Sequence, residues 1–292
     1  METDRSFSGY LRLIPELGKV RIALPVSLSA ITGYLAAETP WTVTAWYVLA
    51  GVFLLALGAS ALNQAQEYPF DLKMERTRRR PIPSGRITPV AAQAIAWILI
   101  ASGSFILYSG CGQLSFLLGL MTIFWYNVLY TYLKRISAFA VVPGSMVGAL
   151  PPLIGWTATG VPIDNAALTL AAFFFIGQIP HFWLIILSIG KQYEEAGYPS
   201  LSAVLSKRQI GSLTLVWIAA TGTTSLLLPI NRTIDSPIAA WLLVAGVVWM
   251  FYSFLRMSWQ SVENIQPRKG FIVLNLFFLL VMMLVWLNAL LA

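Results

Sequence analysis

The chain of 292 residues is 58% hydrophobic and only 11% charged, and its mean hydropathy is +0.73. This composition excludes an ordinary soluble domain, because many apolar runs approach the roughly 20 residues that cross a bilayer as a helix. The single cysteine, Cys111, excludes a disulfide framework, and the single histidine, His181, excludes a multi-histidine metal site. The net charge of +7 is compatible with nucleic acid, but its distribution indicates membrane topology and a phosphate site, so no nucleic-acid partner is expected.

The apolar runs predict an all-α integral membrane protein with nine transmembrane helices, as a single domain over 1–292. The first 20 residues carry charges of both signs and do not form a signal peptide, so 1–20 is expected to be a short cytosolic segment. The nine expected spans are 21–38, 43–62, 90–108, 113–133, 139–158, 166–188, 210–229, 238–257 and 270–291.

Positive charge divides the connecting segments into two sets. One set contains all 19 Lys and Arg residues except Arg232, and its members are 1–21, 63–89, 134–138, 189–209 and 256–269. The positive-inside rule therefore predicts that this set, with the N-terminus, faces the cytosol and that the C-terminus lies outside. The two long inner loops, 63–89 and 189–209, are expected to carry the active site, because loops longer than about 12–15 residues are usually functional.

The segment from 63 to 86, NQAQEYPFDLKMERTRRRPIPSGR, concentrates charge in an otherwise apolar chain. Asn63, Glu67 and Asp71 recur every fourth residue, so on a helix they would share one face. Oxygen ligands beside a basic cluster are what a site needs to hold Mg²⁺ together with a diphosphate. Pro69 is expected to kink or end the helix, so the shared face is expected only as far as Glu67. The alternative is a helix end that frays into solvent with ordinary polar residues.

Two further groups of polar residues allow both a functional and a structural interpretation. The basic run after Asp71 can bind phosphate oxygens or can anchor in lipid head groups. The exit of the span 113–133 carries a polar stripe that could line a cavity and reach a diphosphate, or could be an interfacial belt. The residues of this stripe are Tyr126, Asn127, Tyr130, Thr131, Lys134 and Arg135.

Ionisable residues also occur near the second inner loop. His181 lies within the span 166–188, where it could ligate iron, donate to a carboxylate or hydrogen-bond between helices. Glu194 and Glu195 are the only acidic residues of the loop. They could supply a second metal site or could be solvated.

The residues described above resemble the UbiA superfamily of intramembrane prenyltransferases, and within it the haem O branch. The segment 130–160 and the peptides PHFW at 180–183 and AGYP at 196–199 match that branch, and the resemblance covers roughly 9–208. The first motif of the family, an Asn-x3-acid-x3-Asp pattern that runs into a basic stretch, is matched by Asn63, Glu67, Asp71, Met74, Arg76, Thr77, Arg80 and Pro81.

This resemblance implies a helical bundle around a central cavity, in a bacterial inner membrane and surrounded by membrane lipid. It implies Mg²⁺-dependent transfer of a farnesyl group from farnesyl diphosphate to a vinyl group of haem B, giving haem O. Haem A synthase or oxidase assembly factors would be protein partners. The alternatives are prenylation of an aromatic quinone precursor and a non-catalytic homologue that binds haem or lipid.

The resemblance also implies roles for individual residues. Catalysis falls to Asn63, Glu67, Asp71 and Lys134. Metal binding falls to Asn63, Glu67, Asp71, Glu194 and Glu195. Substrate binding falls to Arg76, Arg80, Tyr126, Tyr130, Arg135, His181, Lys191 and Tyr193. One position departs from the family pattern, since Gln192 stands where the family usually has an aspartate, so the second metal-binding motif is not carried over intact.

Overall fold

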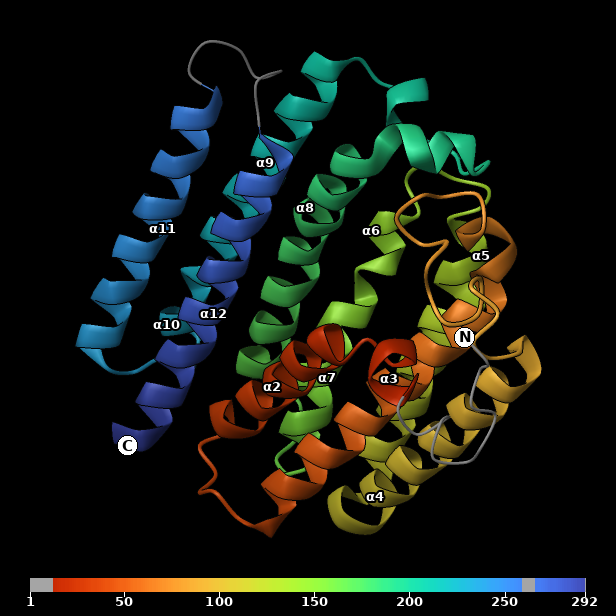
Figure 1. Cartoon of the computed structure of the whole chain (residues 1–292). Helices are drawn as coiled ribbons and strands as arrows, with labels where there is room; N and C mark the ends of the chain where they lie inside the picture. Colours follow the sequence, from red (N-terminus) through yellow and green to blue (C-terminus); the bar gives the residue numbers. More distant parts are fainter. Residues whose placement is uncertain (1–12, 259–265, 292) are drawn as a thin grey trace.

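The computed structural model describes residues 13–258 and 266–291, and within these ranges every regular element is a helix. Figure 1 shows a bundle in which the long helices lie side by side. The expected all-α class is confirmed. In chain order the elements are α2 (Val20–Ala36), α3 (Val43–Asp71), α4 (Pro89–Ile123), the π-helix η1 (Phe124–Tyr130), α5 (Thr131–Leu133), α6 (Val141–Gly144), α7 (Met146–Thr157), α8 (Asn165–Glu195), the 3₁₀-helix η2 (Leu201–Ala203), α9 (Lys207–Ser225), α10 (Leu227–Ile230), α11 (Pro237–Ser258) and α12 (Pro267–Leu291).

In the described part of the chain, six helical segments are long and apolar enough to cross a membrane. The architecture of an integral membrane protein is therefore confirmed, but the expected count of nine spans is not. The helix α2 has 17 residues, and the expected span 139–158 is divided between α6 and the 12-residue α7. The six segments are Val43–Asp71, Pro89–Leu133, Asn165–Gly190, Lys207–Ile230, Pro237–Ser258 and Pro267–Leu290.

A bend at Gly112 divides the longest of these segments. Its backbone has φ 83° and ψ 172°, a conformation that glycine adopts at little cost and that other residues avoid. Gly112 therefore separates two helices that share the label α4, at the place where the sequence divides the expected spans 90–108 and 113–133. The second of these helices continues into η1 and α5.

The helices α3 and α8 extend further than the expected spans 43–62 and 166–188. The helix α3 continues through Pro69 to Asp71, and α8 continues to Glu195. Because Pro69 stands near the end of α3, its missing N–H removes a hydrogen bond only from the last turns. The polar residues at the start of the first expected loop therefore stand on a regular helix face.

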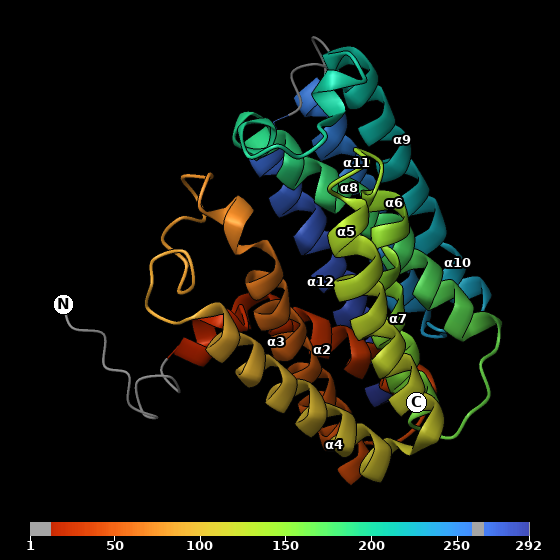
Figure 2. The same cartoon turned by 90° about the vertical axis from the view of Figure 1, so that its right-hand side faces the viewer.

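Two apolar cores lie on opposite sides of the bundle. One joins α8, α9, α11 and α12, and the other joins α2, α3 and α4. Figure 2 shows α5, α6 and α7 passing between the two groups of helices. Small residues let α2 approach α7 closely, because a Cβ atom at Gly155 would overlap the carbonyl oxygen of Ala30, and one at Gly33 would overlap that of Pro152.

The connections after α3 and after α8 lie at the same end of the bundle (Figure 2). They meet in a small apolar cluster that contains the buried side chains of Met74, Ala196 and Tyr198. The backbone N–H of Arg76 also donates to Oε1 of Gln192 at 3.3 Å. The structure thus joins the two segments that the sequence analysis selected as the carriers of the active site.

Candidate active site

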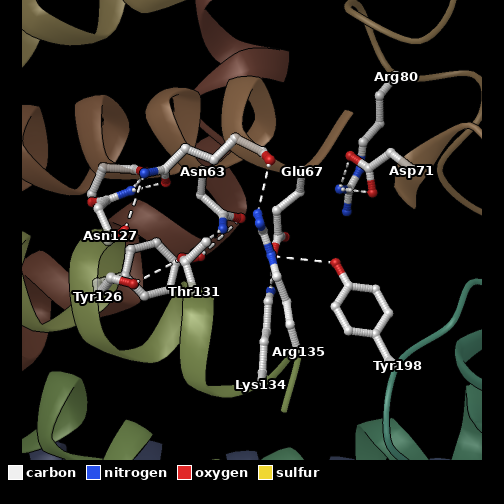
Figure 3. Close-up of polar contacts among 12 residues, drawn as sticks. Asn63, Glu67, Asp71, Arg80, Tyr126, Asn127, Thr131, Lys134, Arg135 and Tyr198 are labelled. Atoms are coloured by element: carbon white, nitrogen blue, oxygen red, sulfur yellow. Dashed lines mark hydrogen bonds and ion pairs between the residues drawn. The ribbon is translucent and has the colours of Figure 1, made fainter. Parts of the chain in front are cut away.

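The first motif lies on one buried face at the end of α3. Asn63, Glu67 and Asp71 are 2%, 5% and 1% exposed. Their four-residue spacing on a continuous helix turns all three toward the interior (Figure 3). The expectation of a shared face is confirmed and extends to Asp71, and the alternative of a solvated, frayed helix end is excluded.

Each of the two carboxylates is paired with a cation. Asp71 accepts two hydrogen bonds from one guanidinium nitrogen of Arg80, at 2.9 and 2.8 Å. Glu67 Oε1 lies 2.5 Å from the Nζ of Lys134. Buried charges are costly unless they are paired, so these contacts account for two carboxylates inside an apolar bundle. Figure 3 shows both pairs converging on the same region.

Asn63 connects α3 to the π-helix and to the segment before α2. Its Nδ2 donates to the hydroxyl of Thr131 at 3.1 Å. Its Oδ1 accepts hydrogen bonds from the Tyr126 hydroxyl at 3.3 Å and from the Lys19 Nζ at 3.4 Å. Asn63 thus holds a cation that the sequence analysis did not place in the site.

The polar stripe of η1 and α5 is buried against α3. A π-helix is rare and is frequently found at functional sites. Within η1, Asn127 donates to the carbonyl oxygen of Ala59 at 3.0 Å and to Oε1 of Gln66 at 3.2 Å. Because Asn127 and Tyr130 are buried, an interfacial belt does not describe these two residues.

Aromatic rings surround the cations at the end of α5. The Nζ of Lys134 lies 5.4 Å from the ring centroid of Tyr130 and 5.8 Å from that of Tyr198, within cation–π distance. The guanidinium of Arg135 lies 5.0 Å from the Phe70 ring and donates to the carbonyl oxygen of Gln66 at 2.9 Å. Lys134 and Arg135 are therefore held beside the first motif, as expected.

Tyrosines from the second inner segment complete this wall. The ring of Tyr193 stacks on that of Tyr198 with centroids 4.4 Å apart. The Tyr198 hydroxyl reaches Glu67 Oε1 at 3.4 Å. Tyr193 was expected to bind substrate, whereas Tyr198 was not singled out. Tyr198 lies in the peptide AGYP, which matches the haem O branch.

The acidic residues of the second inner segment do not join the first motif. Glu194 and Glu195 are exposed, and Glu194 accepts a hydrogen bond from the Ser202 hydroxyl at 2.5 Å. In residues 13–258 and 266–291, no three Asp, Glu, His or Cys side chains are grouped so that they could hold a metal ion. The expected five-residue metal set is not brought together, because Glu194 and Glu195 are exposed at the end of α8 whereas Asn63, Glu67 and Asp71 are buried.

Two expected substrate-binding residues lie apart from this cluster or outside the described side chains. The ring of His181 packs on that of Phe271 with centroids 4.6 Å apart, and within the described ranges its Nδ1 has no hydrogen-bond partner. It therefore lies in an aromatic environment and has no carboxylate partner there. Lys191 belongs to α8, but its side chain is outside what the structure describes.

Desolvation lowers the pKa of two basic side chains near the site. Burial, followed by repulsion from Arg80, lowers the pKa of Lys19 to about 7. The pKa of Arg76, whose side chain is exposed, is lowered from its ordinary value by partial desolvation and then by repulsion from Arg80. By contrast, Arg78 is exposed and lies 3.6 Å from Glu75.

Two spaces of very different volume lie near the second inner segment and α5. A groove of about 730 Å³ lies along the end of α8, η2 and the start of α9, and Gln192 and Lys207 line it. Next to Tyr130 and Lys134 there is a space of only about 10 Å³. Neither of these two spaces is lined by Asn63, Glu67 or Asp71.

The donor set of the first motif fits Mg²⁺. This ion prefers hard oxygen ligands and usually binds one or two carboxylates together with substrate phosphate oxygens. Glu67 and Asp71 supply two carboxylates on adjacent turns of α3, and Asn63 supplies an amide oxygen one turn earlier. Arg80 and Lys134 already neutralise the carboxylates, so a metal ion would compete with these two cations.

Besides Tyr198, three polar residues of the site have no predicted role in the sequence analysis. Lys19 lies in the segment 1–20, which is predicted to be a short cytosolic segment. Gln64 and Gln66 lie in the same polar run as Asn63 and Glu67, and both donate to distant backbone oxygens. Polar amides in a membrane helix are the signal that could have identified the two glutamines.

Comparison with known sequences places this geometry among prenyltransferases. The pattern of the UbiA prenyltransferase family matches residues 26–279. The chain is 38% identical over 227 residues to a protoheme IX farnesyltransferase of Geobacter sulfurreducens, covering 77% of this chain and 84% of the relative. It is 33% identical over 279 residues to a protoheme IX farnesyltransferase of Oleidesulfovibrio alaskensis, covering 94% and 95%.

Solved structures share this fold. A structure of digeranylgeranylglyceryl phosphate synthase superposes with a TM-score of 0.74 at 15% identity, covering 96% of this chain and 98% of that one. A UbiA homologue from Archaeoglobus fulgidus, bound to GPP and Mg²⁺, superposes with a TM-score of 0.68 at 13% identity, covering 94% and 99%. At these identities the similarity establishes the fold.

Proposed function

Because the chain belongs to the UbiA prenyltransferase family, we propose that it transfers a farnesyl group from farnesyl diphosphate to a vinyl group of protohaem IX (haem B), giving haem O. The names of the relatives support the choice of donor and acceptor. The observation that carries the proposal is the cluster on α3. Two buried carboxylates, Glu67 and Asp71, lie there among more cations than they can neutralise.

Asn63, Glu67 and Asp71 would hold Mg²⁺ in this reaction. When bound, the ion supplies neutralisation of the negative charge that develops on the leaving diphosphate. Arg80 and Lys134 would then turn from their carboxylates to diphosphate oxygens. Their positions within hydrogen-bond distance of Asp71 and Glu67 support this exchange, because the same short movement reaches a ligand bound to those carboxylates.

The proposed chemistry is a displacement with cationic character. The C1–O bond of farnesyl diphosphate breaks, and diphosphate leaves with the electron pair. Arg80 and Lys134, with Arg76 and Arg135, would donate to its oxygens and lower the barrier to ionisation. The vinyl π electrons of the haem then bond to C1 of the farnesyl cation. Water adds to the resulting cation on the haem side chain, and one proton is released.

Aromatic faces near Lys134 suit the allylic cation. Tyr130 stacks between Tyr126, at 6.0 Å, and Phe182, at 5.9 Å between centroids. Ring faces attract cations, and a site that excludes water protects the cation until the acceptor reacts. These three rings would therefore lie where the farnesyl chain leaves the diphosphate.

The proposal is tested with purified protein in lipid nanodiscs, supplied with farnesyl diphosphate, haem B and Mg²⁺. Mass spectrometry should show a haem carrying one hydroxyethylfarnesyl group, and chelation of Mg²⁺ should abolish its formation. A parallel reaction replaces haem with a hydroxybenzoate. Prenylation of the benzoate alone would show that the acceptor is an aromatic quinone precursor. No product from either acceptor would rule out both enzymatic functions.

A further inference from the structure

The segment that precedes α2 places a cation inside the site. Lys19 is partly buried, and its Nζ lies 3.4 Å from Oδ1 of Asn63. Asn63 stands one turn before Glu67 on the same face of α3. The Lys19 ammonium therefore lies beside the oxygen ligands of the first motif, although it is 44 residues away along the chain.

The backbone of Lys19 has an uncommon, strained conformation. Its φ is 53° and its ψ is 59°, in the left-handed region that residues with a Cβ atom rarely occupy. The other described residues of this kind, Glu38 and Arg232, are exposed and lie in connecting turns. Backbone strain at a partly buried, charged residue persists where the surroundings enforce it, and such residues cluster at functional sites.

Two sets of hydrogen bonds hold the segment that precedes Lys19. The side-chain amide of Gln64 donates to the carbonyl oxygens of Glu16, at 3.0 Å, and Leu17, at 2.8 Å. The Glu16 carboxylate accepts two hydrogen bonds from Arg86, at 2.7 and 2.6 Å. The turn before Lys19 is thus attached to α3 on one side and to the end of the first inner segment on the other.

The charges of the site leave Lys19 without a carboxylate partner. Among the described side chains, Glu67 is paired with Lys134 and Asp71 with Arg80. Lys19, Arg76 and Arg135 are further cations near the same two carboxylates and have no carboxylate of their own among the ion pairs of the described residues. The unpaired guanidinium groups of Arg76 and Arg135 and the side chain of Lys19 make this end of the site cationic, which favours an anionic ligand.

We propose that Lys19 binds the diphosphate of the prenyl donor, and that Gln64 positions it by holding the turn that precedes it. This inference rests on the proposed function and adds a binding residue from outside the two inner loops. The ammonium group lies beside Asn63, at the start of the motif that would hold the metal and diphosphate. A lysine binds phosphate as a point charge with three donors.

The test measures the binding of farnesyl thiodiphosphate, an unreactive donor analogue, by calorimetry in nanodiscs with Mg²⁺. Lys19→Met should weaken binding about 10- to 100-fold, because it removes a hydrogen bond to a charged group. Lys19→Arg should retain most of the affinity. Gln64→Met should weaken binding less than Lys19→Met, because the ammonium group remains but is no longer held.

Arg78→Met is the matched control. It removes one positive charge from the same end of the bundle, but Arg78 is exposed and lies against Glu75. It should leave donor binding within about twofold, because exposed ion pairs contribute little. Equal losses in Lys19→Met and Arg78→Met would show that only net charge matters and would overturn the assignment.

Two further outcomes separate this inference from the function on which it rests. If the unmodified protein binds the analogue and Lys19→Met binds it equally well, the role of Lys19 is wrong while the diphosphate site stands. If Lys19→Met leaves donor binding intact and raises only the KM for haem, the lysine binds an acceptor carboxylate and the diphosphate assignment is overturned. If the unmodified protein binds no analogue, the proposed function fails as well.

Discussion

Single residues in this protein serve the fold and the site together. The Asp71 carboxylate neutralises Arg80, while its backbone carbonyl oxygen accepts a hydrogen bond from the Thr77 hydroxyl at 2.9 Å. The helix end and the start of the first inner segment are therefore fixed by the residue that would bind the metal. A conservative change at this position separates the two roles.

Asp71→Asn should reduce farnesyl transfer by at least about 100-fold. The neutral amide keeps the shape of the side chain but loses a charged metal ligand and the partner of Arg80. Haem O formation measures the effect. Glu75→Gln removes an acidic side chain four residues away that is 75% exposed, and it should retain full activity. Unchanged activity in Asp71→Asn would remove this residue from the metal site.

Tyr198→Phe should cost less than about fivefold in turnover. The hydroxyl makes only a long hydrogen bond of 3.4 Å to Glu67, whereas the ring stacks on Tyr193 and faces Lys134. Tyr198→Ala removes the ring as well and should reduce turnover about tenfold or more. The two rates are compared under the same conditions. A larger loss in the phenylalanine variant would assign the hydroxyl a direct role in the reaction.

Among the elements, α2 and α7 approach each other closely enough for backbone to contact backbone. Gly155 and Gly33 each face a carbonyl oxygen of the opposite helix. Without a hydrophobic force between helices in lipid, such close van der Waals contact is a main source of association. The position of α2, and with it the segment that carries Lys19, therefore depends on this seam.

Gly155→Ala should destabilise the protein by about 1–3 kcal/mol or more, because the added methyl group overlaps the Ala30 carbonyl oxygen and forces the helices apart. Gly190→Ala is the matched control, since no atom lies within 4 Å of the added group and alanine favours the helix. Thermal unfolding in detergent compares them. Equal melting temperatures for the two variants would contradict close packing at Gly155.

At the scale of the whole molecule, the distribution of Lys and Arg predicts the orientation in the membrane. In a Cys111→Ser background, Arg78→Cys marks the first inner segment and Arg232→Cys marks the turn before α11; both native side chains are exposed. A membrane-impermeant maleimide should label position 232 in intact cells and position 78 only after permeabilisation. Labelling of position 78 in intact cells would reverse the predicted topology.

Local patterns predicted the parts of the site that lie on one helix. The spacing of Asn63, Glu67 and Asp71 depends only on helix geometry, so it could be read directly. The position of Lys19 depends on hydrogen bonds between Gln64 and a segment 47–48 residues away, which no local pattern encodes. The helix ends were misplaced for a related reason, because polar residues packed inside the protein extend α3 beyond its apolar run.

The number of spans shows a further limit of hydropathy. Apolar runs identify segments of the chain that can reside in a bilayer, but they do not show where a helix bends or is interrupted. Gly112 interrupts the helical backbone where two expected spans meet, and Ser145 separates α6 from α7 within another expected span. These interruptions arise from backbone geometry that the apolar composition leaves open.

The internal pairing of both carboxylates has a thermodynamic consequence. A divalent ion that binds Glu67 and Asp71 must release Lys134 and Arg80, and the freed cations are then unpaired until an anion arrives. Metal and diphosphate should therefore bind with positive coupling, and by reciprocity each should raise the affinity of the other by the same factor. The protein would then bind each ligand weakly in the absence of the other, and dissociation of diphosphate would favour dissociation of the ion.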